Sequence, residues 1–203
     1  MKIRLEEEND HLEVEKLVRD AFWNVYRPGA YEHYIVHHLR NDESFISNRA
    51  YVIEYGGKIV GHINYSTGFI DCGDERIDAV VLGPISIHES YQNNGLGSKL
   101  IKSTLDLAES QGIPFVFVIG DEDYYHRFGF ESASKYGIFL EGTQADDECS
   151  FFMINVFDES DLKSGIFHNP KVFDVDEDEV DEFDKRFEFK EKLVLDTQLK
   201  ELQ

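Results

Sequence analysis

The chain has 203 residues, of which 41% are hydrophobic and 13% aromatic, so it can fill the core of one folded domain. Its formal net charge of -21 repels phosphate backbones and anionic headgroups, which argues against nucleic acid and membrane surfaces as partners. Cys72 and Cys149 lie far apart and outside any metal-binding spacing, which predicts free thiols and no metal site. With no apolar leader stretch in the first residues, the expectation is a cytoplasmic protein.

The first part of the chain predicts two helices followed by a hairpin. A short strand is expected over residues 3–5, and Asn9 or Asp10 can cap a helix whose apolar positions recur at helical spacing. A Pro-Gly pair separates it from a second helix over residues 31–39. Residues 51–65 then alternate about a Gly-Gly turn, which predicts a hairpin whose second arm runs on to residue 72.

The middle of the chain predicts two central strands separated by a helix. Residues 78–87 and 114–119 are apolar and β-branched, as in buried strands, and residues 97–110 have helical periodicity up to a cap at Gly112. A short helix is expected around residues 124–128, closed by Gly129, with later strands near residues 130, 137–140 and 151–156. The order predicts a mixed α/β (α+β) layered domain over residues 1–156.

Residues 157–203 are expected to form an acidic C-terminal extension that packs on or beside this domain or pairs with a second chain in a homodimer. The run DVDEDEVDEFD, which ends at Asp184, is typical of a solvated tail or an exposed helix. Residues 185–195 alternate, which places Phe187, Phe189, Leu193 and Leu195 on one side of an extended segment.

The stretch between residues 87 and 98 carries the strongest functional signal. A strand ends at Ile87, and Gln92-Asn93-Asn94-Gly95-Leu96-Gly97 leads into a helix. The first turn of a helix has unpaired N–H groups, and glycine lets an anion approach the backbone closely, so this loop is a candidate phosphate seat. It lacks the third glycine of a dinucleotide loop and is no Walker loop; a plain helix-entry turn is the alternative.

Two motifs in order give the loop its context. The loop fits [Q/R]-x-x-G-x-[G/A], and residues 124–130, YYHRFGF, fit Y-x-x-x-GF after the next strand. Together they resemble the GCN5-related N-acetyltransferase (GNAT) superfamily, and residues 82–130 are similar to its YhbS-like bacterial subgroup. The resemblance implies a layered fold with a central, mostly antiparallel mixed sheet, helices on its faces and two splayed central strands.

The resemblance also implies acetyl-CoA as the cosubstrate, with no metal. The splayed strand would pair its backbone with the pantetheine at Ile85, Ser86 and Ile87. The diphosphate would lie on the amides of Gln92, Asn93, Asn94, Gly95, Leu96, Gly97 and Ser98. Pro84 has no N–H to donate to a ladder, which suits a bulge at the point of splay.

The implied reaction is transfer of an acetyl group to a primary amine of a small molecule or peptide, by direct attack in a ternary complex. Tyr125 matches the tyrosine that serves the leaving thiolate in this family, and Tyr124 is the alternative. The candidate bases that accept the amine proton are His88 and Glu89, then Glu54 and His62 in the hairpin, or water. Two rival interpretations are a non-catalytic acyl-CoA-binding or sensor module and an interaction domain with no ligand.

Overall fold

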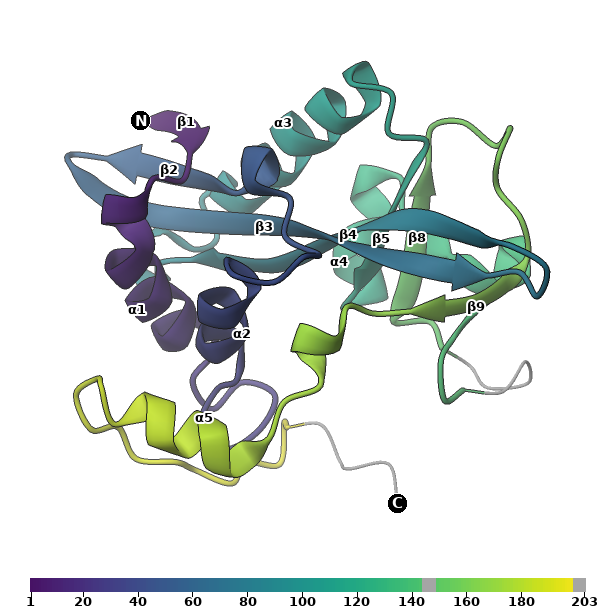
Figure 1. Cartoon of the computed structure of the whole chain (residues 1–203). Coiled ribbons are helices and arrows are strands. Elements are labelled where there is room, and N and C mark those ends of the chain that lie inside the picture. The colour runs from purple at the N-terminus through teal and green to yellow at the C-terminus, as the bar shows by residue number, and fades with distance from the viewer. Residues whose placement is uncertain (144–148, 199–203) are drawn as a thin grey trace.

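A twisted, mixed nine-stranded sheet runs through the molecule, as the computed structural model shows for residues 1–143 and 149–198 (Figure 1). Seven strands follow the order β1-β2-β3-β4-β5-β8-β6, and β9 pairs with β3 and β7. The mixed sheet flanked by helices confirms the predicted fold class. The elements are β1 (Lys2–Leu5), α1 (His11–Phe22), α2 (Glu32–Leu39), β2 (Tyr51–Tyr55), β3 (Lys58–Asp71), β4 (Arg76–Ile87), α3 (Leu96–Ser110), β5 (Phe115–Ile119), α4 (Glu122–Tyr125), β6 (Glu131–Ser132), β7 (Ile138–Leu140), β8 (Phe152–Val156), β9 (Gly165–His168) and α5 (Glu177–Asp184).

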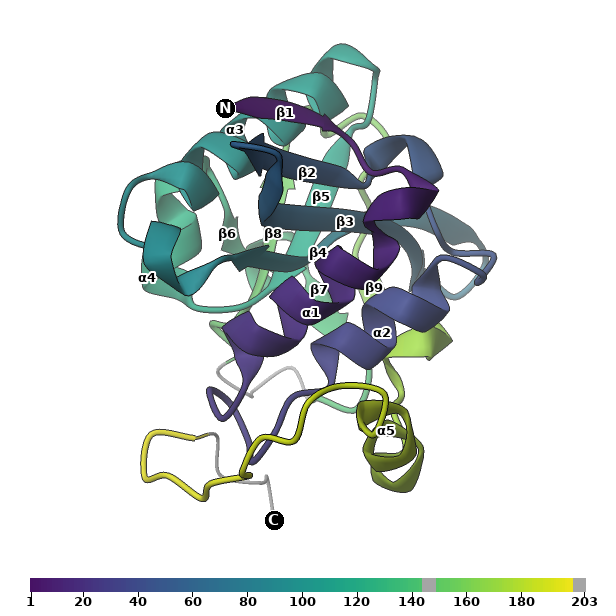
Figure 2. The same cartoon turned by 90° about the vertical axis from the view of Figure 1, so that its left-hand side faces the viewer.

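Helices cover both faces of the sheet. Figure 2 shows α1 and α2 side by side on one face, with α3 on the other. Val14, Leu17 and Val18 of α1 pack against Val52 and Ile59 of the hairpin. On the opposite face the apolar stripe of α3 packs against the alternate side chains of the central strands; these include Leu100, Ile101 and Leu105 on the helix and Ile63, Tyr65, Val80 and Leu82 on the strands. The apolar side chains that recur every second residue in the strands and about every 3.6 residues in the helices thus form two apolar layers, one on each face of the sheet.

The two central strands separate after a short parallel pairing. Val80–Leu82 of β4 pair with Val116–Val118 of β5, and within the described residues the pairing ends there although β4 continues to Ile87. On its other side, β4 pairs with β3 through a register shift. Ile85 lies opposite Ile63 and Leu82 opposite Tyr65, so two residues, Gly83 and Pro84, face one residue on β3. The bulge expected at Pro84 is confirmed.

Part of the chain after residue 156 belongs to the sheet. The sequence analysis did not predict β9, which pairs with β3 at Phe69–Asp71 and with β7. Four residues, GIFH, show too little alternation to be recognised as a strand. The division of the chain at residue 156 stays a prediction.

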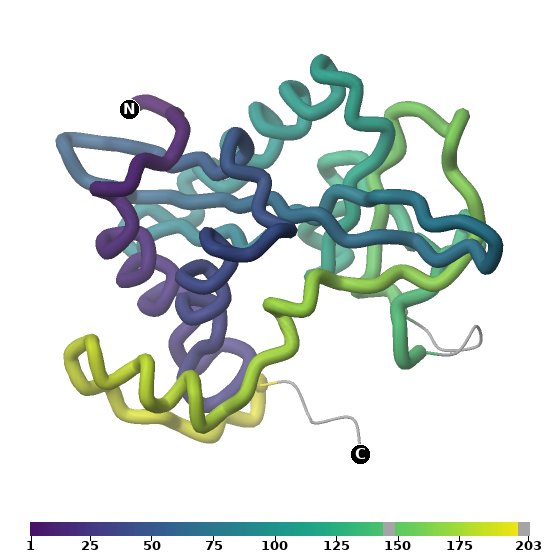
Figure 3. The backbone as a smooth tube through the Cα atoms, in the orientation of Figure 1, coloured from purple at the N-terminus to yellow at the C-terminus, as the bar shows by residue number. Residues whose placement is uncertain are grey.

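The acidic run forms a helix that docks on α1 and α2 (Figure 3). The Asp184 carboxylate accepts hydrogen bonds from Arg19 Nε and Nη2 at 2.5 and 2.8 Å and lies 3.1 Å from Nε2 of His33. Val180 and Phe183 of the same helix are buried. The run is therefore neither a tail nor fully exposed, because three-residue spacing places its two apolar side chains on one face.

The prediction that residues 185–195 form an extended segment with apolar side chains on one side is wrong. No strand forms there among the described residues, and Phe189 and Val194 are 92% and 88% exposed. The segment instead crosses the loop after α1, where Trp23 Nε1 donates a hydrogen bond to the carbonyl of Glu191 at 3.0 Å. Alternation alone makes no strand, since a strand needs a sheet edge to pair with.

We expect Asp184→Asn to weaken the fold by about 1–2 kcal/mol, because it leaves the guanidinium of Arg19 without its counter-charge in a partly buried site. Urea denaturation at pH 7 measures this. Asp181→Asn is the matched control, since its ion pair with Lys192 lies on the exposed side of the same helix and should cost little. Equal loss in both variants would contradict the prediction.

Acid should unfold the wild type through the same cluster. Burial lowers the pKa of His33 to about 4, so the unfolded chain takes up a proton that the folded chain refuses as the pH falls below about 6.5. Burial opposes the charge of Asp184, but Arg19 and His33 outweigh it and lower its pKa, which adds a second loss of stability below about pH 4.

Candidate active site

The predicted phosphate loop is the entry to α3. Gly95 is the N-terminal cap residue of this helix, with a left-handed backbone at φ +76°, and within the described residues no heavy atom lies within 4 Å of the position a Cβ would take. The loop shapes itself through its own side chains, because Gln92 Nε2 donates to the carbonyl of Ile87 and Asn94 Nδ2 to that of Gln92. The open side of Gly95 is therefore where an anion can reach the helix N-terminus.

Gly97 has a different structural role from Gly95. A Cβ at Gly97 would lie 2.8 Å from the hydroxyl oxygen of Tyr124, and the Ser98 side chain also interacts with that hydroxyl. The absent side chain lets the first turn of α3 approach α4 closely. The loop and the tyrosine motif, which are separate in sequence, are thus in direct contact.

The three predicted pantetheine-binding residues lie on β4 beyond its pairing with β5. Ile85, Ser86 and Ile87 pair with β3 through Ile63, His62 and Gly61. Among the described strands none pairs with the other edge of this segment. Backbone groups on such an edge can add an extended ligand as a further strand. Ile85 and Ile87 pack toward the α3 face, and Ser86 is 3% exposed on the opposite face.

Tyr125 ends α4 directly after the diverging end of β5. Asp121 caps its helix, because the Asp121 carboxylate accepts a hydrogen bond from the N–H of Asp123 at 3.0 Å. The Tyr125 ring is 8% exposed and packs against Gly120, where a Cβ would lie 2.5 Å from Cε2 of the ring. Burial raises the pKa of the Tyr125 hydroxyl, so it keeps its proton at neutral pH.

The neighbouring tyrosines differ from Tyr125 in their partners. The hydroxyl of Tyr65 bonds to Thr104 at 2.8 Å, and that of Tyr124 interacts with Ser98. The Tyr125 hydroxyl makes no hydrogen bond to the part of the chain that the structure describes. Of these three tyrosines, Tyr125 is the one whose hydroxyl is left free to donate to a ligand.

The four candidate bases lie in different surroundings. His88 and Glu89 are exposed on the turn after β4, where Nδ1 of His88 accepts a hydrogen bond from the N–H of Ser90 at 3.2 Å. Glu54 accepts one from Arg4 Nε at 2.9 Å. His62 is 0% exposed, with Nε2 3.7 Å from a carboxylate oxygen of Glu6. All four assignments stay predictions.

The sequence profile of the acetyltransferase (GNAT) family matches residues 13–130, which include the loop, the diverging strand and Tyr125. The chain belongs to the GNAT family. The resemblance seen in the two sequence motifs is therefore confirmed.

Relatives of this GNAT chain extend the likeness beyond the motifs. The Escherichia coli K12 protein described as the uncharacterized N-acetyltransferase YhbS is 29% identical over 138 residues, which cover 68% of this chain and 78% of that protein. A GNAT acetyltransferase from Brucella melitensis, solved in complex with acetyl-CoA, has a TM-score of 0.69 and 27% identity over 85% of this chain and 97% of its own. The E. coli YhbS structure, a complex with CoA, shares the fold at a TM-score of 0.73 and 24% identity, covering 86% and 92%.

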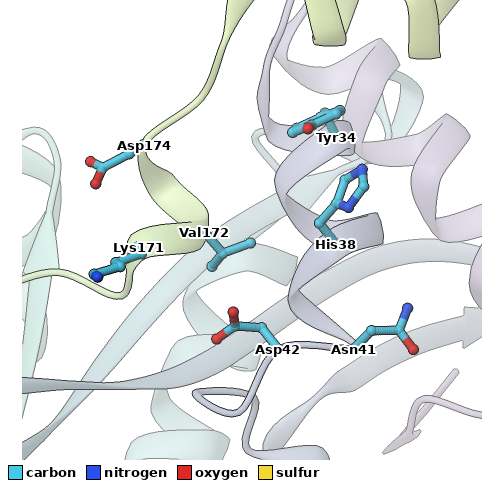
Figure 4. A pocket seen from close by; sticks show the side chains of 7 residues that line it. All are labelled: Tyr34, His38, Asn41, Asp42, Lys171, Val172 and Asp174. Carbon is cyan, nitrogen blue, oxygen red and sulfur yellow. The ribbon is translucent and has the colours of Figure 1, made fainter.

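A groove of about 400 Å³ lies away from these motifs, between α2 and residues 171–174. Figure 4 shows Tyr34 and His38 on α2 across from the segment that carries Lys171, Val172 and Asp174, with Val172 pointing toward His38 and with Asn41 and Asp42 below. None of the predicted site residues lines this groove. Across residues 1–143 and 149–198, no three His, Cys, Asp or Glu side chains are placed to hold a metal ion, and no helix is long and apolar enough to cross a membrane.

Proposed function

We propose that this GNAT protein transfers an acetyl group from acetyl-CoA to a primary amine of a small molecule or peptide, by direct attack in a ternary complex. One observation carries the proposal: the unpaired edge of β4 leads straight into the glycine loop at the start of α3, with Tyr124 against the loop and Tyr125 in the same apolar cluster as Ile85 and Ile87. The acetyl-CoA bound to the Brucella relative supports the choice of cosubstrate.

The residues present fit acetyl-CoA along its length. The open side of Gly95 and the first-turn N–H groups of α3 would hold the diphosphate. The backbone of residues 85–87 would pair with the two amides of the pantetheine. An extended ligand that runs from the loop back along β4 brings its thioester to the bulge at Gly83 and Pro84.

Tyr125 would act on the leaving group. Expulsion of the thiolate places negative charge on sulfur in a site that burial keeps poor in water. A phenol that stays protonated at neutral pH donates a hydrogen bond to that sulfur and supplies its proton as the carbon–sulfur bond breaks. The amine must lose a proton before it attacks, and this second transfer needs a separate group.

We expect saturating acetyl-CoA to raise the melting temperature by about 5 °C or more, since a ligand at 100 times its Kd adds about 2.7 kcal/mol. N-acetylcysteamine thioesters, which lack the diphosphate, should give a much smaller shift. Thiol release should then appear with at least one of spermidine, kanamycin and a peptide with a free α-amine.

The outcomes separate the proposal from its rivals. Binding without thiol release on any acceptor would favour a sensor module. Absence of acetyl-CoA binding would favour an interaction domain with no ligand. The homodimer expected from the sequence stays a prediction that sedimentation of the whole chain would test.

A further inference from the structure

A row of polar side chains lies buried in the central strands on the face covered by α1 and α2. His62, Asn64 and Ser66 occupy alternate positions of β3, and Ser86 lies opposite His62 on β4. Three are 0% exposed, and Ser86 is 3% exposed. The residues between them, Ile63 and Tyr65, face the apolar layer under α3. Interior strand positions are normally apolar, so the row calls for an explanation other than packing.

Most polar atoms of this row are unpartnered. Within residues 1–143 and 149–198, both ring nitrogens of His62, both amide atoms of Asn64 and the hydroxyls of Ser66 and Ser86 have no hydrogen-bond partner. Buried polar groups without a partner destabilise a protein, and native interiors satisfy them with ordered water or a ligand. Six such atoms on one face indicate a place built for polar occupants.

The middle of the row lies where the thioester is expected. Asn64 is the β3 residue that faces the bulge at Gly83 and Pro84, where β4 leaves β5. Ser86 lies in the β4 segment proposed to pair with the pantetheine, and its side chain turns to the opposite face from α3. His62 follows at about 7 Å along β3 from Asn64 and about 5 Å across from Ser86, by strand geometry.

The far end of the row meets a fixed negative charge. Nε2 of His62 lies 3.7 Å from Oε2 of Glu6, and Arg40 donates at 2.6 Å to Oε1 of Glu6 and, through its other nitrogen, to Glu15. Burial opposes the charge of Glu6, but His62 and Arg40 outweigh it and lower its pKa to about 2. At neutral pH the carboxylate therefore stabilises a positive imidazole but accepts no proton itself.

The charged groups around His62 come from three elements. Glu6 lies in the connection between β1 and α1, and Arg40 follows α2. Behind them are Glu15 of α1, in contact with His37 of α2, and His11, whose carbonyl oxygen is 3.5 Å from Arg40. The strand neighbours Val52 and Ser86 bear no charge. Glu6 is thus the charged group that lies within salt-bridge distance of His62.

We propose that His62 accepts the proton of the attacking amine, with Asn64 positioning the amine at the bulge and the Ser86 hydroxyl and ordered water relaying the proton. This inference rests on the proposed acetyl transfer. The ammonium form of the acceptor gives one proton to neutral His62. The free amine then forms the carbon–nitrogen bond as the carbon–sulfur bond breaks. Tyr125 gives its proton to the thiolate and is reprotonated by the second proton of the amine nitrogen. The imidazolium of His62 then returns its proton to solvent.

Rate measurements over pH 5–9 test the inference, with the acceptor found in the screen of spermidine, kanamycin and the free-amine peptide. We expect His62→Gln to lower kcat at least 30-fold while the KM for acetyl-CoA changes less than about twofold. The fall in kcat toward acid should disappear in this variant, because glutamine cannot accept the proton of the amine. His168→Gln, on β9, is the matched control and should keep the wild-type profile.

A second variant keeps the inference testable if His62→Gln unfolds. Glu6→Gln removes the negative charge that lies 3.7 Å from Nε2 of His62, so the acid limb of kcat should move to lower pH. A merely structural role would not shift that limb. A limb that stays in place in both variants, or that vanishes in His88→Gln instead, overturns the inference. Absence of thiol release by wild type on every acceptor would instead refute the proposed function, and this inference with it.

Discussion

Tyr125→Phe should lower kcat about 100-fold and leave the melting temperature and the Kd of acetyl-CoA nearly unchanged. The ring is 8% exposed, so phenylalanine keeps its packing against Gly120, Phe128 and Phe130. Only the hydroxyl is lost, and within the described chain that hydroxyl has no hydrogen-bond partner to leave unpaired. The loss therefore falls on the step in which the thiolate departs. Stopped-flow or steady-state thiol release measures it.

Two further variants serve as comparisons for Tyr125→Phe. Tyr136→Phe removes a hydroxyl from a tyrosine outside the site and should change kcat less than twofold. Gly120→Ala should lower kcat as Tyr125→Phe does and should also lower the melting temperature, because the new Cβ lies 2.5 Å from the ring and displaces it. A Tyr125→Phe variant with wild-type kcat would show that another group serves the thiolate.

The pH profile of Tyr125→Phe carries further information. Burial raises the pKa of Tyr125 above the usual value of about 10, so its hydroxyl does not titrate between pH 5 and 9. The variant should therefore keep the shape of the wild-type profile at a lower rate. If one limb of the pH profile of kcat disappeared in Tyr125→Phe, the hydroxyl of Tyr125 would have to titrate near neutral pH.

Gly95→Ala should weaken acetyl-CoA binding at least 10-fold. Its backbone has φ +76°, so the added methyl costs about 1 kcal/mol in strain and points into the open space where the diphosphate is expected. The strain lowers stability, and the methyl group keeps the anion from the first-turn N–H groups. Calorimetric titration with acetyl-CoA measures the Kd.

The other end of the same helix offers a matched control. Gly112 follows α3 with φ +79°, and no heavy atom of the described residues lies within 4 Å of its Cβ position. Gly112→Ala should cost the same stability and leave the Kd unchanged. Equal affinities of the two variants for acetyl-CoA would show that the loop does not bind the diphosphate, which would contradict the proposed position of that group.

The sequence by itself determined the central strands, the helices of the first 130 residues and the two motifs, because these signals are local. Glycines at the mouth of a helix, an apolar β-branched run and helical periodicity each depend on a few neighbouring residues. For that reason the entry at Gly95, the central strands and the helix before Gly129 were predicted within a few residues of their observed bounds. The proline at the bulge was also recognised, since its missing N–H is a property of one residue.

Only the tertiary structure decided what depends on residues far apart in the chain. β9 is a strand because β3 and β7 supply its hydrogen bonds. Residues 185–195 alternate more clearly in sequence, but they have no sheet edge to pair with and form no strand among the residues described. Gly97 proved to adjoin Tyr124, and His62 proved to be a buried histidine facing Glu6, 56 positions away in the sequence, across a salt-bridge distance of 3.7 Å. Burial and charge pairing arise when strands and helices pack, so they cannot be predicted from a local sequence pattern.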